Sequence, residues 1–103
     1  MIVVIGRVRC DAGNREALVE LLTRMQDDSR REDGCLRYGF FAAVEDPLSF
    51  VAVEEWADRE ALDVHFAQPH LQKFGAELLD LITEPPEVAI HEIAGTSPFP
   101  GSS

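Results

Sequence analysis

Residues 35–56 read CLRYGFFAAVEDPLSFVAVEEW, two runs rich in aromatic and β-branched residues with a turn between them. The run 35–44 and the run 49–56 are typical of strands, and Glu45-Asp46-Pro47 is typical of a turn, so the stretch predicts a β-hairpin. Apolar side chains occupy both faces of each predicted strand. Leu36, Tyr38, Phe40, Ala42 and Val44 oppose Phe41 and Ala43, and Phe50, Ala52 and Trp56 oppose Val51 and Val53.

The second apolar face of this hairpin needs a cover. A hairpin that helices cover on one side only would show polar residues on its other face. Another copy of the chain is the simplest cover, because few residues remain to supply one. We therefore predict a homodimer joined through its sheet faces by Phe41, Ala43, Val51 and Val53.

The segments flanking the hairpin carry strand and helix patterns in turn. They predict a strand over 2–10, a helix over about 14–31, helices over 59–67 and 70–82, and a strand over 87–93. Asn14 and Asp58 are the expected N-caps of the first two helices, and Pro69 breaks the second helical region. The order β-α-β-β-α-β indicates an α+β protein with a ferredoxin-like antiparallel sheet and helices on one face. We expect one domain over 1–94 and a flexible tail over 95–103.

Composition narrows the partners. The 103 residues hold 9 Lys and Arg against 19 Asp and Glu, a formal net charge of −10. This excess of negative charge repels nucleic acid and anionic membrane surfaces, so we expect neither as a binding partner. The start MIVVIGRVRC lacks signal-peptide order, no apolar run approaches a membrane span, and Cys10 and Cys35 are too few for a disulfide scaffold. We expect a cytoplasmic protein with reduced thiols.

A set of residues spread along the chain resembles the antibiotic biosynthesis monooxygenase family, in its quinol-monooxygenase-like branch. The set comprises 32–38 (EDGCLRY), Pro47, Phe50, 54–56 (EEW), 61–62 (AL), His65 and 69–70 (PH). The resemblance covers about residues 2–93. It implies a dimeric α+β barrel that oxygenates a small quinol-like or anthrone-like aromatic with O2 and without metal or flavin.

Cofactor-free oxygenation makes specific physical demands. Triplet oxygen reacts slowly with spin-paired molecules unless an electron-rich anion first transfers an electron to it. Such an enzyme needs a dry apolar pocket, a base that deprotonates a phenol, and donors that hold the oxyanion. From the family pattern we predict His65 and His70 as catalytic candidates, and Trp56, Tyr38 and Phe74 as substrate-binding residues.

Other readings of the same residues stay open. His65 lies on an apolar helical stripe and also suits a hydrogen-bonded core residue, while His70 after Pro69 also suits a surface or capping role. Glu54 shares strand parity with Trp56 and is therefore either buried with a partner, for which Arg7 and Arg37 are candidates, or directed into a pocket.

Alternative functions also remain. An isomerase of a small phosphorylated or polar carbonyl compound would use the same histidines as acid and base. A phosphate would need Arg or Lys in the pocket, and Lys73 is the one lysine of the sequence. A non-catalytic dimeric binding domain is a third possibility. The heme-degrading branch is disfavoured, because Gly6 and Gly75 stand where that branch places Asn and the axial His. The sequence has no Cys/His cluster with regular ligand spacing and no dinucleotide loop, so we predict neither a metal nor a cofactor.

Overall fold

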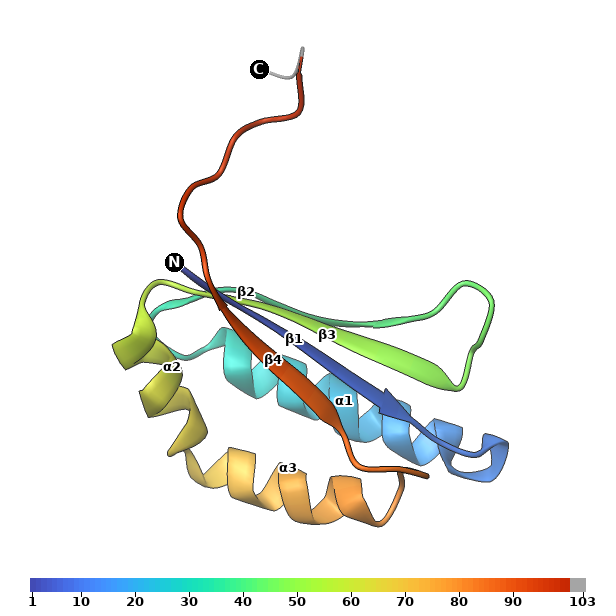
Figure 1. The fold of residues 1–103 in the computed structure, drawn as a ribbon. Helices are drawn as coiled ribbons and strands as arrows, with labels where there is room; N and C mark the ends of the chain where they lie inside the picture. The colour runs from blue at the N-terminus through green and yellow to red at the C-terminus, as the bar shows by residue number, and fades with distance from the viewer. Residues whose placement is uncertain (101–103) are drawn as a thin grey trace.

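The computed structural model describes residues 1–100, and its elements follow the predicted order (Figure 1). They are β1 (Ile2–Arg9), the short 3-10 helix η1 (Ala12–Asn14), α1 (Arg15–Arg30), β2 (Cys35–Ala42), β3 (Ser49–Trp56), α2 (Arg59–Phe66), α3 (Pro69–Leu79) and β4 (Glu87–Glu92). The break between α2 and α3 falls at the predicted proline. The last three residues of the predicted tail lie outside the described residues.

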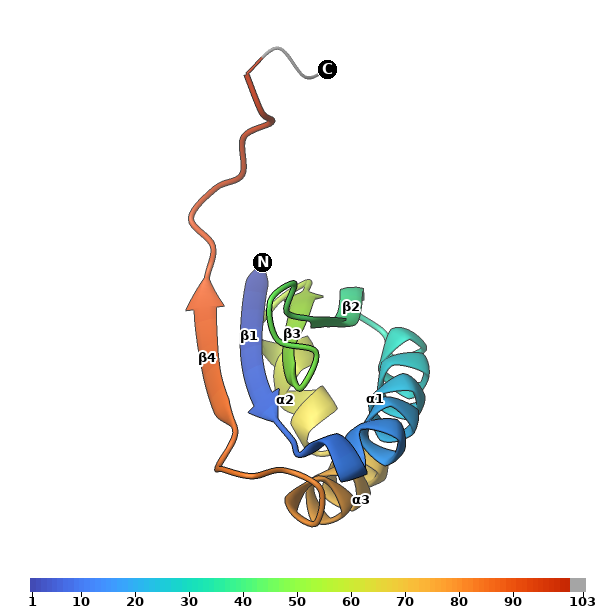
Figure 2. The ribbon, with the colours of Figure 1, turned by 90° about the vertical axis from the view of Figure 1, so that its right-hand side faces the viewer.

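The four strands form one antiparallel sheet in the order β2-β3-β1-β4. All three α-helices lie on the same side of it (Figure 2). The predicted α+β ferredoxin-like architecture is therefore confirmed. In the register of the sheet, Glu54 on β3 lies opposite Val4 on β1 and Tyr38 on β2, which places this glutamate in the middle of the helix-covered face.

A β-bulge corrects the predicted face assignment in β2. Cys35 pairs with Trp56 and Arg37 pairs with Glu55, so Leu36 is the extra residue. The bulge turns Cys35 toward the core and leaves Leu36 54% exposed. The sequence also predicts Val44 on the face of Tyr38, but β2 ends at Ala42 and Val44 is fully exposed in the turn.

One of the two predicted helix N-caps forms a capping hydrogen bond in the structure. Asp58 caps α2 as predicted, with its Oδ1 accepting a hydrogen bond from the Ala61 N–H at 2.8 Å. Asn14 occupies the N-cap position of α1 without a capping bond. Its side-chain amide instead donates to the Leu81 carbonyl at 3.4 Å, so Asn14 ties the start of α1 to the chain after α3.

The core consists of two apolar clusters between the sheet and the helices. One centres on Trp56 and Leu62 and the other on Leu18 and Phe50. Phe74 on α3 packs against both clusters, as does Phe40 on β2. The opposite face of the sheet has no helix over it, and there Phe41 is 58% exposed while Val51 and Val53 are half-buried. Within residues 1–100, none of the helices is both long and apolar enough to cross a membrane.

Candidate active site

A cavity of about 230 Å³ lies between the helix-covered face of the sheet and the helices α2 and α3. Its walls are mainly apolar and include Tyr38, Phe40, Leu71, Phe74 and Leu78. Glu54, His65, Tyr38 and Arg7 are the charged or titratable groups in its lining. A larger groove of about 900 Å³ runs along the β2–β3 turn and residues 84–87, but it contains no histidine. The smaller, histidine-bearing cavity is therefore the better candidate site.

His65 enters this cavity from the last turn of α2. Its side chain is 1% exposed, and its ring packs on Trp56 with 4.3 Å between the ring centroids. The Asp58 cap fixes the start of the same two-turn helix, so the direction of the His65 side chain follows from where α2 begins. The predicted apolar stripe of this helix is thus present, and the histidine on it faces the cavity.

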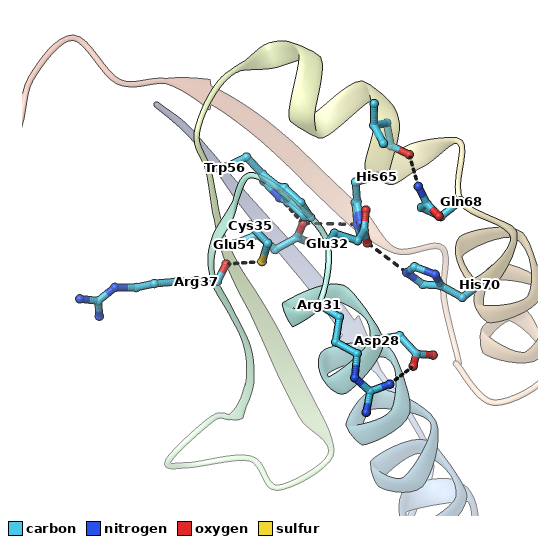
Figure 3. A network of polar contacts seen from close by, with 11 residues as sticks. Asp28, Arg31, Glu32, Cys35, Arg37, Glu54, Trp56, His65, Gln68 and His70 are labelled. Carbon is cyan, nitrogen blue, oxygen red and sulfur yellow. Dashed lines mark hydrogen bonds and ion pairs between the residues drawn. The ribbon is translucent and has the colours of Figure 1, made fainter.

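Glu32, in the loop after α1, joins the two histidines (Figure 3). Its Oε2 lies 2.6 Å from His65 Nδ1 and 3.1 Å from His70 Nε2. An ionised carboxylate only accepts hydrogen bonds, so both facing nitrogens carry protons when Glu32 is charged. In neutral His65 this arrangement leaves the Nε2 lone pair free on the other side of the ring.

Glu54 lies on that other side. Its Oε1 accepts a hydrogen bond from Trp56 Nε1–H at 3.0 Å and is 3.8 Å from His65 Nε2 (Figure 3). The expectation that Arg37 would pair with Glu54 is wrong, since Arg37 lies 3.7 Å from Glu55 on the uncovered face of the sheet. Nor does Arg7 form an ion pair with Glu54 among the described residues. Glu54 instead belongs to the cavity.

Burial determines the protonation of these groups. It raises the pKa of Glu54 to about 7, against the hydrogen bond from Trp56 and with added repulsion from Glu32. Burial also lowers the pKa of His65, partly offset by its hydrogen bond to Glu32. The pKa of Tyr38 is raised by burial as well. Near neutral pH the cavity therefore presents a neutral imidazole beside a carboxyl group close to its midpoint.

The structure brings together some of the sequence-predicted site residues and separates others. His65, Tyr38 and Phe74 line the cavity. Trp56 is fully buried behind Glu54, and it reaches the site through its hydrogen bond and not as a wall of the cavity. His70 lies outside the cavity, in grooves open to solvent. Sequence reasoning gave Glu32 no role, although it stands in the EDG stretch of the family pattern.

Glu32, His65 and His70 also bring potential metal ligands within 4.8 Å of one another. Two histidines and a carboxylate suit several transition metals. With metal–ligand bonds of about 2.1 Å, two ligands of one ion lie about 3 Å or more apart. The contact of 2.6 Å between Glu32 and His65 is shorter than this, and it fits a direct hydrogen bond better than a shared ion.

Comparisons with known proteins place this chain in a family. A family model described as antibiotic biosynthesis monooxygenase matches residues 1–77. The Mycobacterium tuberculosis protein named "Putative monooxygenase Rv0793" is 34% identical over 89 residues, which cover 86% of this chain and 87% of that protein. The Synechocystis protein named "Uncharacterized protein sll1783" is 35% identical over 95 residues, or 92% of this chain, but the match spans only 65% of that relative's length.

Solved structures give the same result. The structure of Rv0793 superposes with a TM-score of 0.87 at 30% identity, covering 94% of this chain and 98% of that one. A structure described as a putative antibiotic biosynthesis monooxygenase from Deinococcus radiodurans has a TM-score of 0.92 at 25% identity, covering 96% and 98%. The likeness therefore extends over the whole domain.

Proposed function

Because the chain belongs to the antibiotic biosynthesis monooxygenase family, we propose that it is a monooxygenase that oxidises a small quinol with O2 and uses His65 as its base. The observation that carries this proposal is the position of His65 in the cavity wall. Glu32 fixes its Nδ1 side, while its Nε2 side faces Glu54 and the cavity lining. A neutral imidazole held in this way can accept the proton of a bound phenol.

The reaction balances without a further reagent. His65 Nε2 takes a phenol proton, and the phenolate transfers one electron to O2. The resulting radical pair combines at a ring carbon to give a hydroperoxide. The O–O bond then breaks, one oxygen stays on the ring as a carbonyl or hydroxyl group, and the other leaves as water with the two hydrogens that the quinol loses. The apolar walls keep solvent from the anion during these steps.

Cavity size favours a compact substrate. An apolar cavity of about 150 Å³ holds a benzene molecule, so 230 Å³ suits one ring or two fused rings better than a three-ring anthrone. Gly6 and Gly75 contribute to this space, because neither projects a side chain into the wall that it helps to form. A one-ring or two-ring hydroquinone is therefore the substrate that we propose.

The charge of the lining argues against the isomerase alternative. A phosphorylated substrate would need cationic side chains at the cavity. Arg7 is the one such group in the lining, and Lys73 lies in an outer groove with His70. An apolar cavity with a carboxyl group and an imidazole suits a neutral phenol better.

We further propose that the enzyme works as a homodimer through the uncovered face of the sheet. Ile5, Val51 and Val53 form an apolar strip along that face, and Phe41 adjoins it. Arg37 and Glu55 form an ion pair beside this strip. An apolar centre with a polar edge is the usual anatomy of an interface between copies.

The test is oxygen uptake with a panel of one-ring, two-ring and three-ring hydroquinones and anthrones. His65→Ala and His65→Asn should each lower kcat by about 10²–10⁴-fold, the usual contribution of positioned proton transfer, while the quinol still binds. Glu60→Gln, an exposed change on the same helix, is the matched control and should act like the wild type.

Two results would contradict the proposal. One is a wild type that takes up no oxygen with any member of the panel. The other is a folded His65 variant whose turnover stays within about threefold of the wild type, since that leaves no room for a base at this position.

A further inference from the structure

A series of short contacts leads from the cavity to the outer surface. His65 lines the cavity, and its Nδ1 contacts Glu32 Oε2 at 2.6 Å. The same oxygen contacts His70 Nε2 at 3.1 Å. The His70 side chain is 23% exposed and lines an outer groove together with Asp28 and Gln68. Figure 3 shows the three groups in this order, contributed by α2, the α1–β2 loop and α3.

The Glu32 side chain, in the middle of this series, forms its hydrogen bonds with the two histidines. Glu32 is 10% exposed, and its Oε1 is buried without a hydrogen-bond partner among residues 1–100. The carboxylate thus directs its hydrogen bonds to the two imidazoles through one oxygen. A group whose only role was to hold the α1–β2 loop would be expected to bind nearby backbone N–H groups.

We propose that Glu32 and His70 form a proton relay between His65 and solvent. This relay rests on the proposed function, in which His65 receives a proton from the substrate. The substrate proton enters at His65 Nε2, and the Nδ1 proton moves to Glu32 Oε2. Once exchange with solvent has left the ring proton of His70 on Nδ1, Glu32 passes a proton to the free His70 Nε2. His70 reaches solvent, where it exchanges its ring protons, so it can present Nε2 with or without a proton.

The burial of His65 explains why the proposed relay is needed. Burial lowers the pKa of His65, so the imidazolium formed by deprotonating a phenol is unstable where it stands. Transfer of the Nδ1 proton to the adjacent Glu32 carboxylate returns His65 to its neutral form. In the last step of the reaction, the oxygen that leaves as water must take up protons in the cavity. The same three residues can carry these protons back from solvent.

The first test uses two changes at His70. His70→Asn keeps a donor for Glu32 but cannot carry a proton, and His70→Ala leaves space for a small carrier. Both should lower kcat about tenfold or more in weak buffer, with KM for the quinol unchanged. Added imidazole should restore kcat in His70→Ala but not in Glu32→Gln, in which the inner link is lost. Gln68→Ala, in the same groove, is the matched control and should act like the wild type.

The second test does not depend on turnover. Proton NMR follows the exchange with water of the His65 Nδ1 proton, which its short hydrogen bond to Glu32 shifts downfield. The relay predicts slower exchange in His70→Asn than in the wild type, and this result would support the relay even if no quinol were oxidised. If wild-type oxygen uptake is absent, the proposed function fails independently of this measurement.

Three outcomes would overturn the relay. Exchange in His70→Asn as fast as or faster than in the wild type would mean that His70 only covers Glu32. Loss of turnover in His70→Ala that imidazole does not rescue would point to a structural role. Stoichiometric Zn²⁺ binding by the wild type that is lost in His70→Asn would make the three residues a metal site.

Discussion

Glu54 gives the fold a measurable pH dependence. Its pKa rises from an ordinary value of 4.5 to about 7, chiefly because its side chain is buried. At about 1.4 kcal/mol per pKa unit, this increase corresponds to about 3 kcal/mol. Below pH 4.5 the group is protonated in both states and adds nothing. As the pH rises from 4.5 to 7, the unfolded chain releases the proton while the folded chain keeps it, so folding stability falls.

The perturbation is Glu54→Gln, which removes the titration and keeps an oxygen to accept the Trp56 N–H. Urea unfolding at a fixed protein concentration, from pH 4 to 8, gives the free energy of unfolding of both proteins. The stability of the variant relative to the wild type should rise by about 3 kcal/mol between pH 4.5 and 7 and then level off. Glu55→Gln changes the next residue on the opposite face of β3 and serves as the control.

The comparison also has a clear negative result. The His65 titration has the opposite sign, because its lowered pKa makes stability fall as pH drops below about 6.5, its unfolded value. Taking the difference between variant and wild type cancels most of that effect. A difference that is constant across pH 4.5–7, or that shrinks as the pH rises, would refute the assignment of Glu54 as a buried group that holds its proton.

Four further predictions follow from the fold and the site. Gly34→Ala should lower the free energy of unfolding in urea by about 2–5 kcal/mol, because Gly34 has φ +82° and an added Cβ would lie 2.6 Å from the Ala61 Cβ. Gly13→Ala is the control and should leave the free energy of unfolding unchanged, because an added Cβ at Gly13 has open space around it. Val53→Asp should give monomer or aggregate by light scattering, since it places an unpaired charge in the proposed interface, and a stable wild-type monomer would end that idea. Gly75→Leu should raise the melting temperature and abolish quinol turnover by filling the cavity, whereas Gly75→Ala should keep turnover. Turnover should survive chelator, and purified protein should show no flavin or heme absorbance; stoichiometric metal lost together with activity would contradict this.

The architecture could be predicted from the sequence, because the two-faced apolar strands of the hairpin, the helical stripes of the flanking segments and Pro69 each carry a local signal. The same local patterns could not reveal the bulge. Strand parity has a period of two residues, and one inserted residue at Leu36 shifts that period without any change in composition. The parity of Glu54 was informative, since it offered a buried partner or a pocket as the two possibilities. Its partner was wrongly expected to be an arginine, because pairing across strands cannot be derived from one strand's sequence.

The role of Glu32 could not be predicted from the sequence for a different reason. Its neighbours, SRREDG over 29–34, are typical of a solvated turn, and nothing in them indicates a side chain only 10% exposed. Its burial depends on the approach of α2 and α3 to the α1–β2 loop, which brings together residues more than 30 positions apart. The EDG stretch of the family pattern was the one available signal, and the resemblance assigned no role to its glutamate.

The cavity bears on the two interpretations of His65, as a core residue or as a base. Filling core space with apolar side chains stabilises a fold by roughly 24 cal/mol per Å³ of cavity removed, so leaving this space of about 230 Å³ unfilled forgoes stability. Small domains are stable by only about 5–15 kcal/mol in total, so an unused space of this size would be a substantial loss of folding stability. A larger residue at Gly75 would fill it, and the helix would gain from losing a glycine. These observations favour the proposal that His65 serves both as a core residue and as a site residue, because it packs on Trp56 on one face and borders a space that the sequence leaves open.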